Sequence, residues 1–176
     1  MDVRQFTDGA EHRRYIVRGK RGQWLATVFL CADGLMTTVS DYGNYGYWWR
    51  SIGGDGDIRA FLCRVSDDYL VGKIAPQWET DPDASEAAIK QTIVRLRRAG
   101  TITADEARDE WELLSHVRDG DTGGWWANTS LGKHAFPGDL WCERRSPQAM
   151  AFAEHVMPRL REMLQAEMTA EKGAAK

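Results

Sequence analysis

The stretch WLATVFLCADGLMTTVSDYGNYGYWW (residues 24–49) decides the fold, because it carries two β-hairpin signals in succession. Asp33-Gly34 lies between two apolar runs, and Gly43-Asn44 follows ten residues later. Tight hairpin turns require positive φ, which Gly and Asn adopt readily. We therefore expect residues 24–49 to form three antiparallel strands of a meander.

The expected register assigns each side chain of the meander to a face. Two-residue turns would place Val28 opposite Val39, and Val39 opposite Trp48, so these three would share an apolar face. A further turn at residues 19–22 adds an earlier strand and extends that face by Tyr15, Val17, Trp24 and Ala26. The other face would carry Arg14, Arg18, Thr27, Phe29, Thr38, Ser40, Tyr47 and Trp49. A slip of one residue would exchange the faces of a strand.

The pattern of the whole chain predicts an α+β fold in a single domain, residues 1–176. An N-terminal antiparallel meander of three to five strands occupies residues 1–55 and includes a short strand at Val3–Phe6. Helices, among them an αα-hairpin, occupy 57–118. An irregular segment, 119–145, holds a short helix or a strand pair, and a C-terminal helix occupies 146–170. We expect about four helices to pack on one face of the sheet.

Apolar spacing and capping residues place the helices. Ile58, Phe61, Leu62, Val65 and Tyr69 predict one helix from Asp57 to about Val71, ended by Gly72. Asp81-Pro82 starts a helix over 82–99, and a capping box from Thr103 to Glu106 starts another over 103–117. In the latter helix Ala107, Trp111, Leu114 and Val117 are expected to face inward. Phe152, Val156, Leu160 and Leu164 form the core stripe of the last helix, which Pro158 should kink near Glu154.

Composition limits the classes of function. The chain has 176 residues with a formal net charge of −3, which argues against a strongly basic nucleic-acid binder. Its three cysteines, Cys31, Cys63 and Cys142, have no metal-ligand or disulfide spacing and are expected to be reduced thiols. The start MDVRQFTDG has no signal-peptide core, and no apolar run is long enough to span a membrane. We expect a cytoplasmic protein with no membrane partner.

No catalytic constellation or metal site emerges from the spacing of the titratable residues, and no cofactor is implied. His134, Asp139 and Cys142 lie close in sequence, but sequence proximity is not evidence for a triad. Lys90, Arg95, Arg97 and Arg98 gather towards the end of the helix over 82–99. That placement suits the helix dipole, and the alternative is a basic patch.

An aromatic cluster near the end of the meander is the strongest functional signal. The candidate binding residues are Tyr42, Asn44, Tyr45, Tyr47, Trp49 and Arg50, joined by Arg14 and Arg18 from the earlier strand. Trp48 is assigned to the core. Tyr, Trp and Arg are enriched at interface hot spots because they bury much area and still offer polar contacts. Trp125 and Trp126 form a secondary candidate.

Four segments resemble small phage- and prophage-encoded accessory proteins of unknown function. They are VSDYGNYGYWW (39–49), IRAFLCRVSDDYLVGKI (58–74), ADEARDEWELL (104–114) and AFAEHVMPRL (151–160). The resemblance carries no catalytic or binding residues. It implies a setting in the cytoplasm of the host bacterium, where such proteins often bind and disable a defence or regulatory complex.

Three functions follow as hypotheses. The first is a non-enzymatic phage accessory protein that binds and modulates or inhibits a bacterial host protein complex, for example a defence system such as CRISPR. The second is a module that binds single-stranded nucleic acid through Arg14, Arg18, Tyr47 and Trp49. The third is a small enzyme with a site in residues 119–142.

Overall fold

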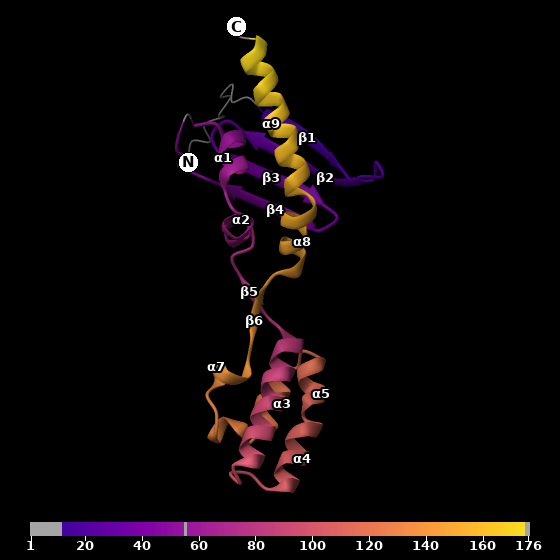
Figure 1. The fold of residues 1–176 in the computed structure, drawn as a ribbon, viewed down its shortest axis with the longest axis vertical. Coiled ribbons are helices and arrows are strands. Elements are labelled where there is room, and N and C mark those ends of the chain that lie inside the picture. The colour runs from indigo at the N-terminus through magenta and orange to yellow at the C-terminus, as the bar shows by residue number, and fades with distance from the viewer. Residues whose placement is uncertain (1–11, 55, 175–176) are drawn as a thin grey trace, which may run out of the picture. The chain divides into compact units, whose positions relative to one another are not determined.

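The computed structural model describes residues 12–54 and 56–174, so the strand expected at Val3–Phe6 lies outside the described part of the chain. The backbone separates into two compact units (Figure 1). Unit 1 combines Met1–Gln77 with Arg145–Lys176, and unit 2 is Trp78–Arg144. The assignment of the chain to a single domain stays a prediction.

Unit 1 is an antiparallel sheet with helices on one face, which confirms the α+β class. Strands β1 (His12–Arg18), β2 (Trp24–Cys31), β3 (Leu35–Ser40) and β4 (Gly43–Trp48) pair in the order of the sequence. Helices α1 (Ile58–Arg64), α2 (Asp67–Ile74), α8 (Pro147–His155) and α9 (Met157–Ala174) contact β2, β4, β4 and β1 respectively (Figure 1). We call the face that they cover the inner face and the opposite one the outer face.

The turn between β2 and β3 lies where expected but has three residues instead of two. Thr27 pairs with Val39 and Val28 with Thr38, which leaves residues 32–34 as the loop. Gly34 at the end of this loop has φ +96°, the left-handed residue that such a three-residue hairpin requires. The extra residue shifts the register by one, so every side chain of β3 lies on the face opposite to the expected one.

The next turn is at Asp41-Tyr42, not at Gly43-Asn44. Val39 pairs with Asn44, and Leu35 with Trp48. The partner of Val39 thus lies four residues earlier in the chain than expected. Because four is an even number, β3 and β4 still share faces as expected. The side chains of β4 therefore also lie on the face opposite to the expected one. The expected faces are therefore wrong for six side chains: Val39 and Trp48 point outward, Thr38, Ser40 and Tyr47 take the inner parity, and Trp49 is buried. The cluster residues Tyr42 and Tyr45 also pack on the core.

The register between β1 and β2 keeps the expected parity. Tyr15 pairs with Val28 and Val17 with Ala26, and all four are buried. A bulge between Val17 and Arg18 sets Trp24 opposite Arg18. The Trp24 indole N–H donates to the outer-face Thr27 hydroxyl at 3.1 Å.

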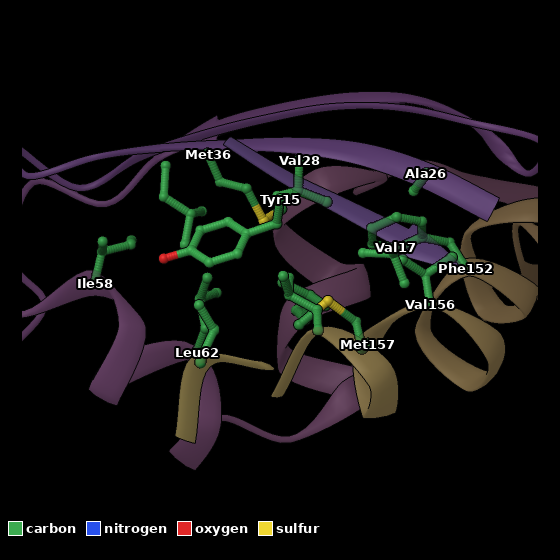
Figure 2. Close-up of a cluster of buried hydrophobic side chains, with 14 of the residues drawn as sticks. Tyr15, Val17, Ala26, Val28, Met36, Ile58, Leu62, Phe152, Val156 and Met157 are labelled. Carbon is green, nitrogen blue, oxygen red and sulfur yellow. The ribbon is translucent and has the colours of Figure 1, made fainter. Parts of the chain in front are cut away.

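The core of unit 1 lies between the inner face and the helices (Figure 2). Met36 and Val28 point from the sheet towards the helices. Leu62 of α1, Phe152 of α8 and Met157 of α9 point towards the sheet and pack against them. Each is fully buried. The stripe of Phe152, Val156, Leu160 and Leu164 is confirmed, since all four are buried.

The helix expected from Asp57 to Val71 is two helices, because a second start signal lies inside it. Ser66 caps α2 by accepting from the Tyr69 N–H, with Asp67 in the first turn. The guanidinium of Arg161 in α9 donates to the carbonyls of Leu62 at 3.0 Å and Val65 at 2.9 Å, satisfying the end of α1. Helix α2 runs through Gly72 to Ile74 instead of ending at Gly72.

Pro158 interrupts the C-terminal helix as its missing N–H requires. Helix α8 ends at His155 and α9 begins at Met157. The break lies at Val156, two residues beyond the expected position at Glu154.

Unit 2 contains the expected αα-hairpin. Asp81 caps α3 (Pro82–Arg98), and the capping box of Thr103 and Glu106 starts α4 (Ala104–Glu112). A short α5 (Leu114–Arg118) follows in place of a continuous helix to residue 117. Leu114 and Val117 are buried as expected, whereas Trp111 is 45% exposed, contrary to the prediction.

Residues 119–145 form short elements fixed by polar contacts. They are α6 (Thr122–Asn128), the 3-10 turn η1 (Leu131–Lys133), α7 (Pro137–Leu140) and β6 (Glu143–Arg145), which pairs with β5 (Trp78–Thr80). Glu110 of α4 is 3% exposed and accepts hydrogen bonds from the Thr129 hydroxyl and from the backbone and hydroxyl of Ser130, at 2.6–2.7 Å. This buried carboxylate holds the loop after α6 against α4.

Candidate protein-binding surface

The outer face of the sheet presents large apolar side chains to solvent. The exposed fractions are 39% for Ile16, 40% for Phe29, 51% for Val39 and 52% for Trp48. Four exposed polar residues accompany them: Arg14, Arg18, Asn44 and Arg50. A cluster of exposed aromatic and aliphatic side chains with a polar surround is typical of a protein interaction site.

Strand pairing arranges these residues in rows across the sheet. Ile16, Thr27, Val39 and Asn44 form one row over all four strands. Arg14, Phe29, Thr37 and Gly46 form the adjacent row. Directly paired side chains on one face touch each other, so the apolar groups of the two rows form one surface.

Trp48 is fixed in place on the edge strand β4. Its indole N–H donates to the carbonyl of Asp33 in the β2–β3 turn at 2.9 Å, and the Arg50 guanidinium lies 5.7 Å from the ring centroid. A half-exposed aromatic ring held in one orientation loses little conformational entropy on binding a partner. Trp48 is therefore the best anchor residue on this surface, although the sequence pattern assigns it to the core.

Four of the predicted binding residues lie on the outer face. Arg14, Arg18 and Asn44 are exposed there, and Arg50, which follows β4, is exposed beside the Trp48 ring. Arg18 donates to the Gly22 carbonyl in its own hairpin at 3.0 Å. No ion pair joins Arg14, Arg18 or Arg50 to another described residue.

The other four predicted residues turn towards the helices. Tyr42 packs on His155 with ring centroids 5.5 Å apart, and Tyr45 packs on Phe152 at 5.2 Å. The Tyr45 hydroxyl also donates to the Tyr42 carbonyl at 2.6 Å. These tyrosines join the sheet to α8 and are not a free surface.

Tyr47 and Trp49 belong to the same internal aromatic group. Their rings meet edge to face at 4.8 Å, and Trp49, 4% exposed, packs on Phe61 at 5.5 Å. The Lys73 ammonium lies 5.7 Å from the Tyr47 ring. Trp49 is therefore a core residue of unit 1, while Tyr47 is half-buried and its role in binding stays a prediction.

The secondary candidates divide between core and surface. Trp125 is fully buried and packs edge to face on Trp126 at 4.9 Å and on Trp141 at 5.3 Å. Trp126 is 36% exposed. Trp125 is thus a core residue of unit 2, and only its neighbour reaches solvent.

Residues 119–142 hold a small pocket but no assembled catalytic group. A hollow of about 220 Å³ is lined by Gly132, His134, Phe136 and their neighbours. Within the described chain the His134 side chain makes no hydrogen bond, and Cys142 engages Ser85 only through its backbone. In the same region His116 Nδ1 lies 3.0 Å from Asp121, which caps α6.

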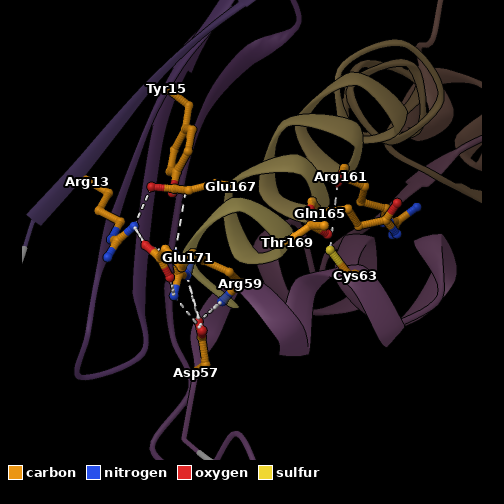
Figure 3. Close-up of polar contacts among 10 residues, drawn as sticks. All are labelled: Arg13, Tyr15, Asp57, Arg59, Cys63, Arg161, Gln165, Glu167, Thr169 and Glu171. Carbon is orange, nitrogen blue, oxygen red and sulfur yellow. Dashed lines mark hydrogen bonds and ion pairs between the residues drawn. The ribbon is translucent and has the colours of Figure 1, made fainter. Parts of the chain in front are cut away.

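A second polar cluster joins α9 to β1 and α1 (Figure 3). Glu167 pairs with Arg13 and accepts from the Tyr15 hydroxyl at 2.6 Å, while Glu171 pairs with Arg13 at 2.7 Å and with Arg59 at 2.9 Å. Hydrogen bonds from Arg59 and then Arg13 lower the pKa of Glu171 to about 2. Burial, followed by the hydrogen bond to Glu167, raises the pKa of Tyr15.

This cluster is structural, because each of its charges faces an opposite charge. Arg59 is 12% exposed and also pairs with Asp57, at 2.8 Å. Its contacts with that carboxylate and with Glu171 raise its pKa. The arrangement fixes the last turns of α9, where the buried stripe has ended at Leu164.

In residues 12–54 and 56–174, no group of histidine, cysteine or acidic side chains could hold a metal ion. None of the helices described is both long enough and apolar enough to cross a bilayer.

Comparison with known protein families gives a match over most of the chain. A family model described as a phage family matches residues 2–166 of the chain. No curated protein and no solved structure shows significant similarity to it.

Proposed function

Because the chain belongs to this family of phage proteins, we propose that it binds a protein complex of the bacterial host through the outer face of its sheet and thereby modulates or inhibits that complex. No catalytic step is part of the proposal. A host defence system such as a CRISPR effector is one partner of this kind. The observation that carries the proposal is the exposed group of Phe29, Val39 and Trp48 beside Arg14 and Arg50.

The chemistry of the surface suits a folded protein partner. Phe29 and Trp48 supply large apolar areas, and the arginines offer fork-shaped donors to carboxylates and carbonyls at the edge. The helices of unit 1 pack on the inner face, so they do not occupy this surface (Figure 1). The sheet therefore has one face built for stability and another available for contact.

The first experiment is affinity capture from a lysate of the host bacterium with wild-type protein and a Phe29→Ala/Trp48→Ala variant. We expect the wild type to recover one host complex in stoichiometric amount and the variant to lose it. Phe136→Ala is the matched control, because Phe136 is 81% exposed in unit 2. A stoichiometric complex that persists with the double variant would place the contact elsewhere, and recovery of no complex by the wild type would argue against the proposal.

Gly46→Arg tests the same surface by adding bulk instead of removing it. Gly46 is exposed in the middle of β4, and a Cβ there would meet only Thr37 Cγ2, at 3.7 Å, and Met36 O, at 3.8 Å. The fold therefore tolerates the side chain, while a partner seated on the outer face would collide with it. Gly138→Arg, at an exposed position with open space around it, is the control.

Single-stranded nucleic acid is the second candidate, because Arg14 and Phe29 are paired neighbours and Arg50 stacks on Trp48. Bases stack on exposed aromatic rings while arginines contact phosphates. Fluorescence anisotropy with labelled single-stranded DNA and RNA at about 50 mM salt tests it, since phosphate contacts weaken steeply with salt. Salt-sensitive binding that Trp48→Ala abolishes would favour this function over a protein partner.

A further inference from the structure

A different exposed surface, in unit 2, combines apolar and basic side chains. The αα-hairpin leaves a groove of about 590 Å³ between α3 and α4, with Ile93, Val94, Ala107 and Trp111 among its lining residues. A second hollow of about 660 Å³ along α3 shares Val94 and Arg98 with it. The two hollows therefore form one continuous surface, which we call the hairpin groove.

The apolar part of the hairpin groove is open to solvent. Val94 is 37% exposed and Trp111 is 45% exposed, although the helical periodicity of α4 predicts an inward Trp111. Ala104 and Ala107 stand beside them and are too small to fill the space between the helices. An antiparallel helix pair with small side chains along one seam leaves room for a third helix to pack.

Positive charge is concentrated around this groove. Residues 78–144 contain 13 Asp and Glu but only 8 Lys and Arg, a net charge of −5. Five of those eight cations line the hairpin groove: Lys90, Arg95, Arg97, Arg98 and Arg108. Glu112 is the one acidic residue among the lining side chains. A basic rim on an acidic unit indicates a partner of negative charge.

Some of these cations form ion pairs within unit 2 and others do not. Lys90 pairs with Glu86 at 2.6 Å and lies 5.7 Å from the Trp111 ring, and Arg108 pairs with Asp105 at 2.9 Å. Arg95, Arg97 and Arg98 form no ion pair with any residue that the structure describes. The helix dipole favours cations at the end of α3, but it does not account for the exposed Val94 and Trp111 beside them.

We propose that the hairpin groove binds an acidic amphipathic helix of another protein. Its apolar residues, at spacings of three and four, would cover Val94 and Trp111, and its carboxylates would pair with Arg97 and Arg98. The proposal is independent of the outer face. Nucleic acid fits less well, because the groove offers one aromatic ring, Trp111, and Lys90 already lies over that ring.

The test is selection of binders from a displayed library of random 18-residue helical peptides against the full chain. We expect the enriched peptides to be acidic, with apolar residues at i, i+3 or i+4, and i+7. Their affinity should fall at least about tenfold in an Arg97→Glu/Arg98→Glu variant, and also as salt rises from 50 to 300 mM. Val94→Glu should have the same effect, and all three positions are exposed, so the fold is retained.

The matched control is Arg14→Glu, the same charge reversal at an exposed site on the outer face of unit 1. It should leave peptide affinity unchanged. Enrichment of neutral or basic peptides, or peptides insensitive to Arg97→Glu/Arg98→Glu, would overturn the proposal. So would tight binding of labelled DNA or RNA at the groove, or a salt-sensitive dimer in sedimentation that these substitutions abolish, because each would identify another occupant.

Discussion

The two faces of the sheet in unit 1 share the same four strands but differ in what their aromatic residues do. On the inner face Tyr45 and Tyr47 lie against helices and are partly buried. On the outer face Phe29 and Trp48 are 40% and 52% exposed. Aromatic content alone therefore does not identify an interaction surface, because strand parity decides whether a ring stabilises the fold or meets a partner.

The largest loss of stability is expected when a side chain of the inner core is truncated. Phe152 of α8 is fully buried beneath the sheet (Figure 2). Its ring contacts that of Tyr45. Phe152→Ala should lower the free energy of unfolding by about 3–5 kcal/mol, because it removes buried apolar area and leaves a cavity. Urea denaturation followed by circular dichroism measures this, and an unchanged midpoint would contradict the described core.

The next effect concerns the turn that sets the parity of β3 and β4. Gly34 has φ +96°, and a Cβ there would lie 2.3 Å from the Trp49 carbonyl oxygen. We expect Gly34→Ala to destabilise by about 1–3 kcal/mol or more, from left-handed strain and the backbone clash. Gly22→Ala is the matched control, since Gly22 has φ +81° with open space around it and should suffer only the strain. Equal losses for the two variants would contradict the close contact at Gly34.

A smaller effect on stability is expected on the outer face. Trp48→Ala removes a half-exposed ring and one hydrogen bond to a turn carbonyl that water can replace. The loss of unfolding free energy should be about 1 kcal/mol or less, while partner binding is abolished. Parallel denaturation and capture experiments separate these outcomes, and a loss as large as that of Phe152→Ala would mean that the ring is part of the core.

The smallest effect is present at neutral pH, disappears in acid, and concerns the attachment of α9 over the inner face. Arg59 and Arg13 depress the pKa of Glu171 to about 2 in the folded protein, from 4.5 (Figure 3). The unfolded chain binds the proton first, so the stability that Glu171 contributes is complete above about pH 4.5 and declines as the pH falls towards 2. Denaturation midpoints of wild type and Glu171→Gln between pH 7 and pH 2.5 should therefore converge in acid. A constant difference across this range would contradict the ion pairs.

The local signals in the sequence predict the elements well. Asp81-Pro82 and the Thr103–Glu106 box start helices where expected, and Pro158 divides the last one. These signals succeed because capping and the missing proline N–H act within one helical turn. Ser66 was missed as a cap because the apolar stripe continues across it.

The candidate surface was harder to predict, because the apolar pattern of residues 35–49 is ambiguous. LMTTVS has apolar side chains at both parities, and Trp48 and Trp49 are adjacent and identical. An alternating pattern of buried and exposed side chains is possible with either tryptophan buried. Only the length of the loop between β2 and β3 decides which of the two lies on the inner face. Asp33-Gly34 suits a two-residue and a three-residue turn alike. One residue of loop thus determines which half of the aromatic cluster is exposed.

The path of the backbone through β5 and β6 makes residues 78–144 an insertion into unit 1. Residues 78–144 enter and leave through two hydrogen-bonded neighbouring strands, and they interrupt unit 1 between Gln77 and Arg145. Because its two ends are adjacent, the inserted segment could be removed and a short turn between β5 and β6 would reconnect the chain. Unit 1 should therefore keep its sheet and outer face when such a turn takes the place of the helices between β5 and β6.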